Sequence, residues 1–143
     1  LREIMSAASY EIPATNKLNE TRYLLNTNKL IVPAGGYYNP KVVCGKTGYT
    51  TPAGNVLATY SEVDGMGVIT VLIKADQGTI FAETSALVDY CGENYRLVTV
   101  DNILDYSRSI PSEDASAQIM TAPAGSFGIL AQNGDDESAY IKN

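Results

Sequence analysis

A lysine, two threonines and a glycine lie within five consecutive residues, Lys46-Thr47-Gly48-Tyr49-Thr50. The hydroxyls of Thr47 and Thr50 can donate hydrogen bonds to a ligand carboxylate, and the Lys46 ammonium provides a favourable potential and can assist proton movement. Gly48 has no side chain, so a ligand can approach the backbone closely. If the segment is an edge strand, an extended peptide can pair with it by strand addition. The plainer alternative is an ordinary surface strand in which Gly48 marks a bulge.

The absence of histidine limits the remaining chemistry. It excludes Ser-His-Asp triads, Cys-His dyads and histidine-ligated zinc or iron sites. Proton transfer is left to Lys, Glu, Asp or Tyr, and a lysine-assisted serine is the nucleophilic chemistry that this composition leaves most open. In this chain, however, no serine is followed by a lysine three residues later or by an asparagine two residues later.

Composition narrows the range of partners. The chain has 143 residues, 45% of them hydrophobic, which predicts a globular protein with one modest core. The formal charge of −6 and the ten scattered basic residues exclude a nucleic-acid partner. No apolar run approaches the roughly 18 residues of a membrane span. The sequence indicates no metal site, because the acidic cluster Asp135-Asp136-Glu137 is typical of a solvated turn. The two cysteines, Cys44 and Cys91, are expected to be small core residues.

Around the pentapeptide, the pattern predicts an antiparallel meander. Its expected strands are Val42 to Thr50, Val56 to Ser61 and Val68 to Lys74, separated by Gly-rich turns. Apolar residues then recur every three to four positions from Ile80 to Cys91, which predicts an amphipathic helix packed on the meander. The fold class is therefore α/β, in the α+β sense, and the pentapeptide is expected to lie on the first strand.

The two ends of the chain have a different texture. Leu1 to Ala8 is expected to be the tail of a helix, with an upstream segment missing, and residues 16–32 show a mixed pattern. Beyond a boundary near Glu93, short β-prone pieces predict a small β-rich unit that is possibly truncated at its end. Ser107 to Ser116 and Asn133 to Ser138 are expected to be loops. We therefore predict domains at residues 1–93 and 94–143.

The order of these features resembles the D-alanyl-D-alanine carboxypeptidases, the low-molecular-mass penicillin-binding proteins. The resemblance rests on Lys46-Thr47-Gly48-Tyr49-Thr50, on Ala53-Gly54, and on a Gly65-Met66 turn before an apolar strand and a helix with Phe81-Ala82-Glu83. Upstream, Leu25-Asn26-Thr27-Asn28-Lys29-Leu30 is similar to an Asn-x-Asn-x-Leu segment of that family. One departure is Cys44-Gly45, because the family usually has glycine two places before the lysine and an aliphatic residue just before it.

The resemblance implies a partial β-lactamase/transpeptidase-like fold: an antiparallel sheet and a packed helix, followed by a small β-rich segment. It also implies serine-type carboxypeptidase activity, without a cofactor, on peptidoglycan stem peptides ending in D-Ala-D-Ala, with β-lactams as further ligands. Lys46 and the backbone N–H of Tyr49, an oxyanion-hole donor, would be catalytic, while Thr47, Gly48 and Thr50 would bind substrate. Export to the cell envelope follows from the same resemblance.

The family places its Ser-x-x-Lys and Ser-x-Asn motifs upstream of the Lys-Thr-Gly, so a missing N-terminal catalytic segment is an expected partner and the chain alone is expected to be inactive. Tyr37-Tyr38-Asn39 spells a variant Tyr-x-Asn motif, but its place directly before the strand indicates coincidence. Two alternatives stay open. One is a non-catalytic cell-wall-binding or regulatory fragment, and the other is a class A β-lactamase-related hydrolase, although those chains generally end soon after the final helix.

Overall fold

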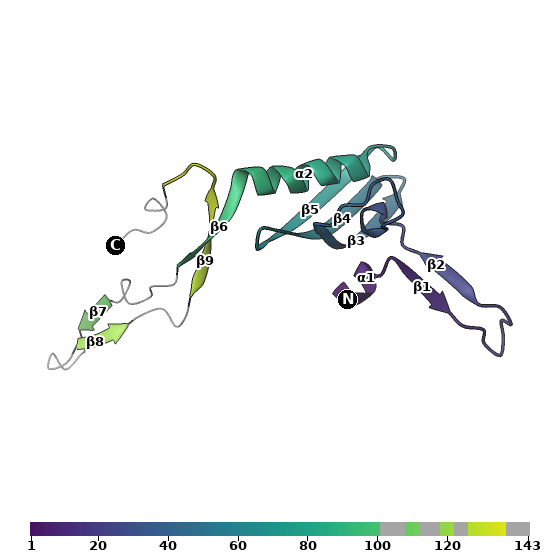
Figure 1. The fold of residues 1–143 in the computed structure, drawn as a ribbon, viewed down its shortest axis with the longest axis horizontal. Helices are drawn as coiled ribbons and strands as arrows, with labels where there is room; N and C mark the ends of the chain where they lie inside the picture. Colours follow the sequence, from purple (N-terminus) through teal and green to yellow (C-terminus); the bar gives the residue numbers. More distant parts are fainter. Residues whose placement is uncertain (101–107, 112–117, 122–125, 137–143) are drawn as a thin grey trace. The chain divides into compact units, whose positions relative to one another are not determined.

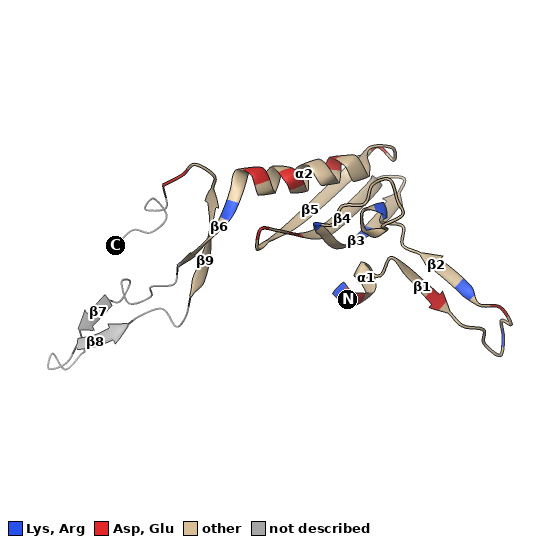
Figure 2. Cartoon of the chain, in the orientation of Figure 1, with Lys and Arg blue, Asp and Glu red and all other residues tan. Residues whose placement is uncertain are grey.

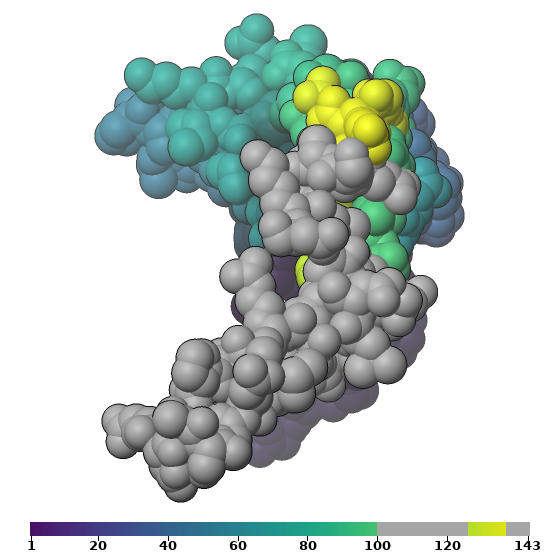
Figure 3. Space-filling view, turned by 90° about the vertical axis from the view of Figure 1, so that its left-hand side faces the viewer, coloured from purple at the N-terminus to yellow at the C-terminus, as the bar shows by residue number. Residues whose placement is uncertain are grey.

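A computed structural model describes residues 1–100, 108–111, 118–121 and 126–136 of the chain (Figure 1). The atoms of the remaining residues are grey in the space-filling view (Figure 3). The chain divides into two compact units, Leu1–Glu93 and Asn94–Asn143.

The first unit is built around a three-stranded antiparallel sheet. Its strands are β3 (Val42–Thr50), β4 (Gly54–Val63) and β5 (Met66–Ala75), in the spatial order β3-β4-β5 (Figure 1). The β4–β5 hairpin turns at Asp64 and Gly65, with φ values of 48° and 81°, as a two-residue turn with both central residues left-handed requires. The meander predicted from the sequence is confirmed, with β4 and β5 longer at both ends.

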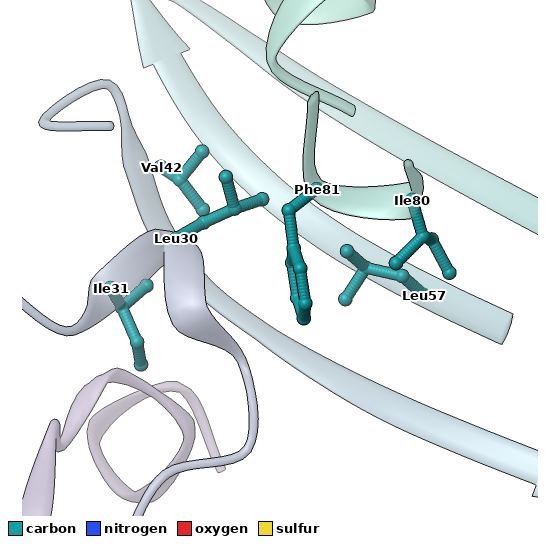
Figure 4. Packing of buried hydrophobic residues seen from close by; sticks show 6 residues of the cluster. All are labelled: Leu30, Ile31, Val42, Leu57, Ile80 and Phe81. Atoms are coloured by element: carbon teal, nitrogen blue, oxygen red, sulfur yellow. The ribbon is translucent and has the colours of Figure 1, made fainter. Parts of the chain in front are cut away.

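Helix α2 (Ile80–Asn94) covers one face of this sheet. Leu57 of β4 is fully buried and belongs to one hydrophobic cluster with Ile80 and Phe81 at the start of α2 (Figure 4). Leu30, Ile31 and Val42 complete the cluster. The predicted helix is confirmed and runs three residues further than expected, to Asn94. Burial of these side chains holds the first turn of α2 close to the middle of the sheet.

Polar contacts tie the segment before β3 to the same helix. Asn39 Nδ2 donates to Ser85 Oγ at 3.2 Å, and Lys41 Nζ lies 2.7 Å from Asp89 Oδ1. The Asn39 Oδ1 atom also accepts from the backbone N–H of Lys41. Asn39 is almost completely buried, so it serves as an anchor for the chain entering β3.

A hairpin that the sequence did not predict precedes the short 3-10 helix η1 (Lys29–Ile31), and only its second strand lies in the mixed segment, residues 16–32. Its strands, β1 (Ser9–Ile12) and β2 (Arg22–Leu25), pair antiparallel. Seven of the eight strand residues are exposed, so no face of the hairpin is buried. Because alternation between apolar and polar residues arises from burial of one face, β2 left no periodic pattern to recognise.

The short helix α1 (Arg2–Ser6) is anchored at Arg2. The Arg2 guanidinium lies 4.6 Å from the Tyr60 ring centroid and donates a hydrogen bond to Glu62 Oε1, which also accepts from the Tyr60 hydroxyl. The hydrogen bond from Arg2 is the main reason why the pKa of Glu62 lies below its ordinary value. Both side chains of the ion pair are more than half exposed, so the pair contributes little to stability.

The small contribution of this contact to stability depends on pH. Because the pKa of Glu62 is lowered in the folded chain, the stabilisation is present above the ordinary carboxyl pKa and is lost as the pH falls through the lowered value. We expect Arg2→Gln to raise the pKa of Glu62 toward its ordinary value. A ¹³C NMR titration of the Glu62 carboxyl group measures this shift, and equal midpoints in the two proteins would contradict it.

The second unit contains two separate antiparallel strand pairs. Strand β6 (Tyr95–Val100) pairs with β9 (Phe127–Gln132), and β7 (Arg108–Pro111) pairs with β8 (Gln118–Thr121). The expectation of a loop from Ser107 to Ser116 is wrong for β7. Proline is tolerated in a strand that pairs on one side only, so Pro111 does not exclude a two-stranded ribbon. Of the loop expected from Asn133 to Ser138, residues 137 and 138 lie outside the described residues.

The two faces of the first unit's sheet differ in how well they are covered. Ile69, Val71 and Ile73 alternate along β5 on the face opposite α2 and are 75%, 57% and 65% exposed. Acidic residues lie along α2, as the red bands in Figure 2 show. Within the part of the chain that the structure describes, no helix has the length and apolar character needed to cross a membrane.

Candidate functional site

The strand β3 has a free edge, and a groove of about 460 Å³ runs along it. The sheet order places β4 on one side of β3 and no described strand on the other. The wall on the β3 side is made by Lys46 to Tyr49 of β3, together with Asn55 and Val56 of the neighbouring strand β4. The opposite wall comes from the segment after β2, the turn before α2 and the start of α2: Thr27, Lys29, Gln77, Ile80 and Phe81. A groove along an unpaired strand edge suits an extended peptide.

Strand alternation distributes the pentapeptide over two faces. Thr47 pairs with Leu57, which belongs to the core under α2, so Thr47 and Tyr49 lie on the helix side of the sheet. Lys46 and Gly48 pair with Ala58 and Val56 and therefore lie on the other face. Residues of both faces of β3 line the groove.

A hydrogen bond between two threonine hydroxyls connects the walls of the groove. Thr27 Oγ1 lies 2.6 Å from Thr47 Oγ1. Thr27 is held in place by its neighbours, since Asn26 Oδ1 accepts from the backbone N–H of Asn28 and Asn28 Oδ1 accepts from that of Leu30. Asn26 Nδ2 also donates to the carbonyl of Ala7. The two asparagines thus shape the backbone around Thr27, and the threonine presents its hydroxyl to Thr47.

Gly45 makes the close approach of this segment to β3 possible. A Cβ atom at Gly45 would lie 2.7 Å from Asn28 Nδ2, 2.8 Å from the Ala58 carbonyl oxygen and 2.9 Å from Thr59 Cγ2. Gly48 is different, because a Cβ atom there would meet nothing closer than 3.9 Å. The first glycine is therefore required by packing, whereas the second leaves open space beside the groove.

The electrostatic character of the groove is positive. Lys29 and Lys46 both line it, and no aspartate or glutamate is among its described lining residues. The Lys46 Nζ atom donates to the backbone carbonyl of Thr47 at 2.5 Å. Neither lysine has an ion-pair partner within the described part of the chain. Two unpaired ammonium groups beside two hydroxyls suit a carboxylate ligand.

The structure brings four of the five sequence-predicted site residues together along the groove: Lys46, Thr47, Gly48 and Tyr49. Thr50 lies outside the lining, and its Oγ1 atom accepts from the backbone N–H of Ala53 in the turn that follows. Thr27 and Lys29 line the groove but were not among the predicted site residues. The Asn26-x-Asn28 segment could have pointed to both residues, because Thr27 lies between the two asparagines and Lys29 follows the second.

Tyr37, in the tyrosine-rich loop before β3, packs against the start of helix α2. Tyr37 lies against Phe81, with ring centroids 5.4 Å apart, and its hydroxyl donates to the Gly78 carbonyl at 3.4 Å. It also lines a second groove, of about 600 Å³, that shares Thr27 and Lys29 with the first.

The described residues contain no group of three or more potential metal ligands. Cys44 and Cys91 are both free thiols.

Comparison with solved structures shows the fold to which this arrangement belongs. A peptidoglycan synthesis regulatory factor (PBP3) from Streptococcus pneumoniae matches with a TM-score of 0.70 and 22% identity, over 95% of this chain and 38% of that one. The D-alanyl-D-alanine carboxypeptidase DacD from Francisella tularensis matches with a TM-score of 0.55 and 20% identity, over 82% of this chain and 30% of its own.

The chain spans less than two fifths of the length of either matched protein. No protein-family model matches the sequence, and no curated protein sequence matches it. At these identities the likeness is one of fold. The chain therefore shares with parts of these two proteins an α+β fold that consists of an antiparallel sheet and a packed helix.

Proposed function

We propose that this chain provides the substrate-binding strand of a serine-type D-Ala-D-Ala carboxypeptidase that acts on peptidoglycan stem peptides outside the cytoplasm. The observation that carries the proposal is the groove along the free edge of β3, lined by two lysines without ion-pair partners among the described residues and by a pair of threonine hydroxyls. A peptide ending in D-Ala-D-Ala combines an extended backbone with a terminal carboxylate. Both features match what the groove offers.

Each residue of the motif has a role in this proposal. The ligand pairs with the edge of β3, and the absent side chain of Gly48 leaves room for it. Thr47 donates to the terminal carboxylate, and the Lys46 ammonium stabilises negative charge on the reacting ligand. The backbone N–H of Tyr49 donates to the carbonyl oxygen as it becomes an oxyanion. Thr50 is proposed to contact the substrate through its hydroxyl, which in the structure accepts a hydrogen bond from the backbone N–H of Ala53.

The reaction needs a nucleophile that this sequence does not contain as a Ser-x-x-Lys motif. A serine on an upstream segment would attack the penultimate D-Ala carbonyl, the terminal D-Ala would leave, and water would hydrolyse the acyl-serine. The exposed apolar row of Ile69, Val71 and Ile73 supports such a partner, because an uncovered apolar sheet face marks an interaction surface. β-Lactams would acylate the same serine.

The proposal is tested by covalent labelling with a fluorescent penicillin. We expect the 143-residue chain alone to remain unlabelled, because it has neither a Ser-x-x-Lys serine nor a histidine to activate another one. Mixing it with a separately produced upstream segment is expected to restore labelling at a serine of that segment. Val71→Asp is expected to reduce this restoration, since it places a charge on the apolar row.

An exposed change on β2, Tyr23→Asp, is the matched control for Val71→Asp, because Tyr23 is 77% exposed and lies outside both the groove and the apolar row. Stoichiometric labelling of the isolated chain would overturn the account of the nucleophile. Equal loss of labelling in both variants would show that the row of Ile69, Val71 and Ile73 has no special part in assembly.

A second candidate is a non-catalytic fragment that binds cell-wall peptides or regulates their synthesis. It is supported by the likeness in fold to a peptidoglycan synthesis regulatory factor (PBP3) from Streptococcus pneumoniae. The two candidates differ in turnover: in the protein that contains this chain, release of D-alanine from a D-Ala-D-Ala peptide supports the enzyme. Binding of the same peptide without release supports the second candidate.

A further inference from the structure

Lys29 lies on the same wall of the groove as Thr27. The residue between them, Asn28, is fully buried, whereas Thr27 and Lys29 are exposed and both line the groove. The backbone thus alternates, with one side chain toward the core and its two neighbours toward the groove. Because Thr27 Oγ1 contacts Thr47 Oγ1, this wall meets β3 at the hydroxyl that is proposed to bind the ligand carboxylate.

Two aromatic rings position the Lys29 ammonium. Its Nζ atom lies 5.8 Å from the ring centroid of Tyr37 and 5.8 Å from that of Phe81. The rings are themselves restrained, because they contact each other and the Tyr37 hydroxyl donates to the Gly78 carbonyl. Within the described residues, Lys29 has no ion pair that would neutralise its charge. The groove therefore has a second cation that is held by rings and available to a ligand.

We propose that Lys29 is a specificity-determining residue: together with Lys46 it makes the groove select peptides with a free terminal carboxylate over the same peptides ending in a carboxamide. The inference rests on the proposed function, in which the carboxylate lies at the Thr27–Thr47 hydroxyl pair. A carboxylate there has a cation on each wall of the groove, Lys46 on the β3 wall and Lys29 on the opposite wall. A carboxamide has no charge and loses both interactions while keeping the same shape.

The test uses two probes, diacetyl-L-Lys-D-Ala-D-Ala and its C-terminal amide. Their equilibrium binding to the full 143-residue chain is measured from the NMR shifts of the Thr47 and Tyr49 amides. We expect Lys29→Met, which keeps an apolar stem and removes the charge, to weaken binding of the acid about tenfold and to leave binding of the amide unchanged. Lys29→Arg is expected to keep most of the preference for the acid.

Lys17→Met is the matched control, because it removes the same charge from an exposed residue outside the groove. Thermal unfolding of each variant verifies that the fold is retained. Equal weakening of acid and amide by Lys29→Met would overturn the inference, since Lys29 would then support the shape of the groove only. Equal affinity of the unmodified chain for both probes would overturn it as well.

Cleavage of the acid probe tests the proposed function, and the acid-to-amide binding ratio tests the role of Lys29, so the failure of one can be told from the failure of the other. In the protein that contains this chain, cleavage of the acid probe supports the carboxypeptidase, and an unchanged acid-to-amide ratio in Lys29→Met then overturns the role of Lys29 alone. If the acid probe is bound in preference to the amide but never cleaved, the carboxypeptidase fails. The role of Lys29 in carboxylate recognition is then supported by the binding ratio.

Discussion

Replacement of Lys46 by alanine in the proposed carboxypeptidase is expected to slow acylation by penicillin by a factor of about 10² to 10³, the loss typical of removing one preorganised electrostatic group. The reason is the position of the ammonium group, which lines the groove and has no ion-pair partner among the described residues. A charge that is free in the resting protein is available to the reacting ligand. Stopped-flow measurement of acylation gives the rate directly.

The same substitution is expected to leave the fold intact. Lys46 is exposed, and its one hydrogen bond goes to the backbone carbonyl of its neighbour, Thr47. Lys17→Ala removes an identical charge from an exposed position away from the groove and serves as the control. Acylation rates that are equal in Lys46→Ala and Lys17→Ala would show that Lys46 is an ordinary surface residue of the strand.

Replacement of Gly45 by alanine is expected to destabilise the first unit by about 3 kcal/mol, since overpacking in a close-packed site typically costs 1–3 kcal/mol and here three atoms are too close at once. One of the three is the Ala58 carbonyl oxygen, 2.8 Å from the position of the new Cβ atom. Because Ala58 is in the neighbouring strand, backbone would have to move to relieve that contact. Thermal unfolding monitored by circular dichroism measures the loss.

Gly48→Ala is the matched control for this prediction, because it makes the same change three residues along the same strand. A Cβ atom at Gly48 meets no atom closer than 3.9 Å, so stability is expected to be unchanged or slightly higher. Penicillin acylation of the proposed carboxypeptidase is nevertheless expected to fall, since the methyl group occupies space next to the groove. Similar melting temperatures for the Gly45→Ala and Gly48→Ala variants would contradict the packing argument.

The positions of the strands and of the main helix could be predicted because burial imposes a period on them. Strands β3 to β5 and helix α2 each have a face against one core, and the Asp64-Gly65 pair marks a two-residue turn in residue types alone. The exposed hairpin of β1 and β2 was not predicted as a pair, since seven of its eight strand residues are exposed. Long-range pairing without a buried face leaves no such period in the sequence.

The local chemistry of the site was determined by the sequence itself: a lysine, two threonines and a glycine in five residues of a β-prone segment define which groups can meet a carboxylate and a peptide backbone. The tertiary structure decided which of them do so together. It left Thr50 outside the groove lining, with its hydroxyl bonded to the turn that follows, and it brought Thr27 Oγ1 to 2.6 Å from Thr47 Oγ1 across 20 residues of sequence. It also set Lys29 over two rings that come from other segments. Such contacts depend on Gly45 allowing close approach and on a core that joins distant segments, and neither can be read from spacing along the chain.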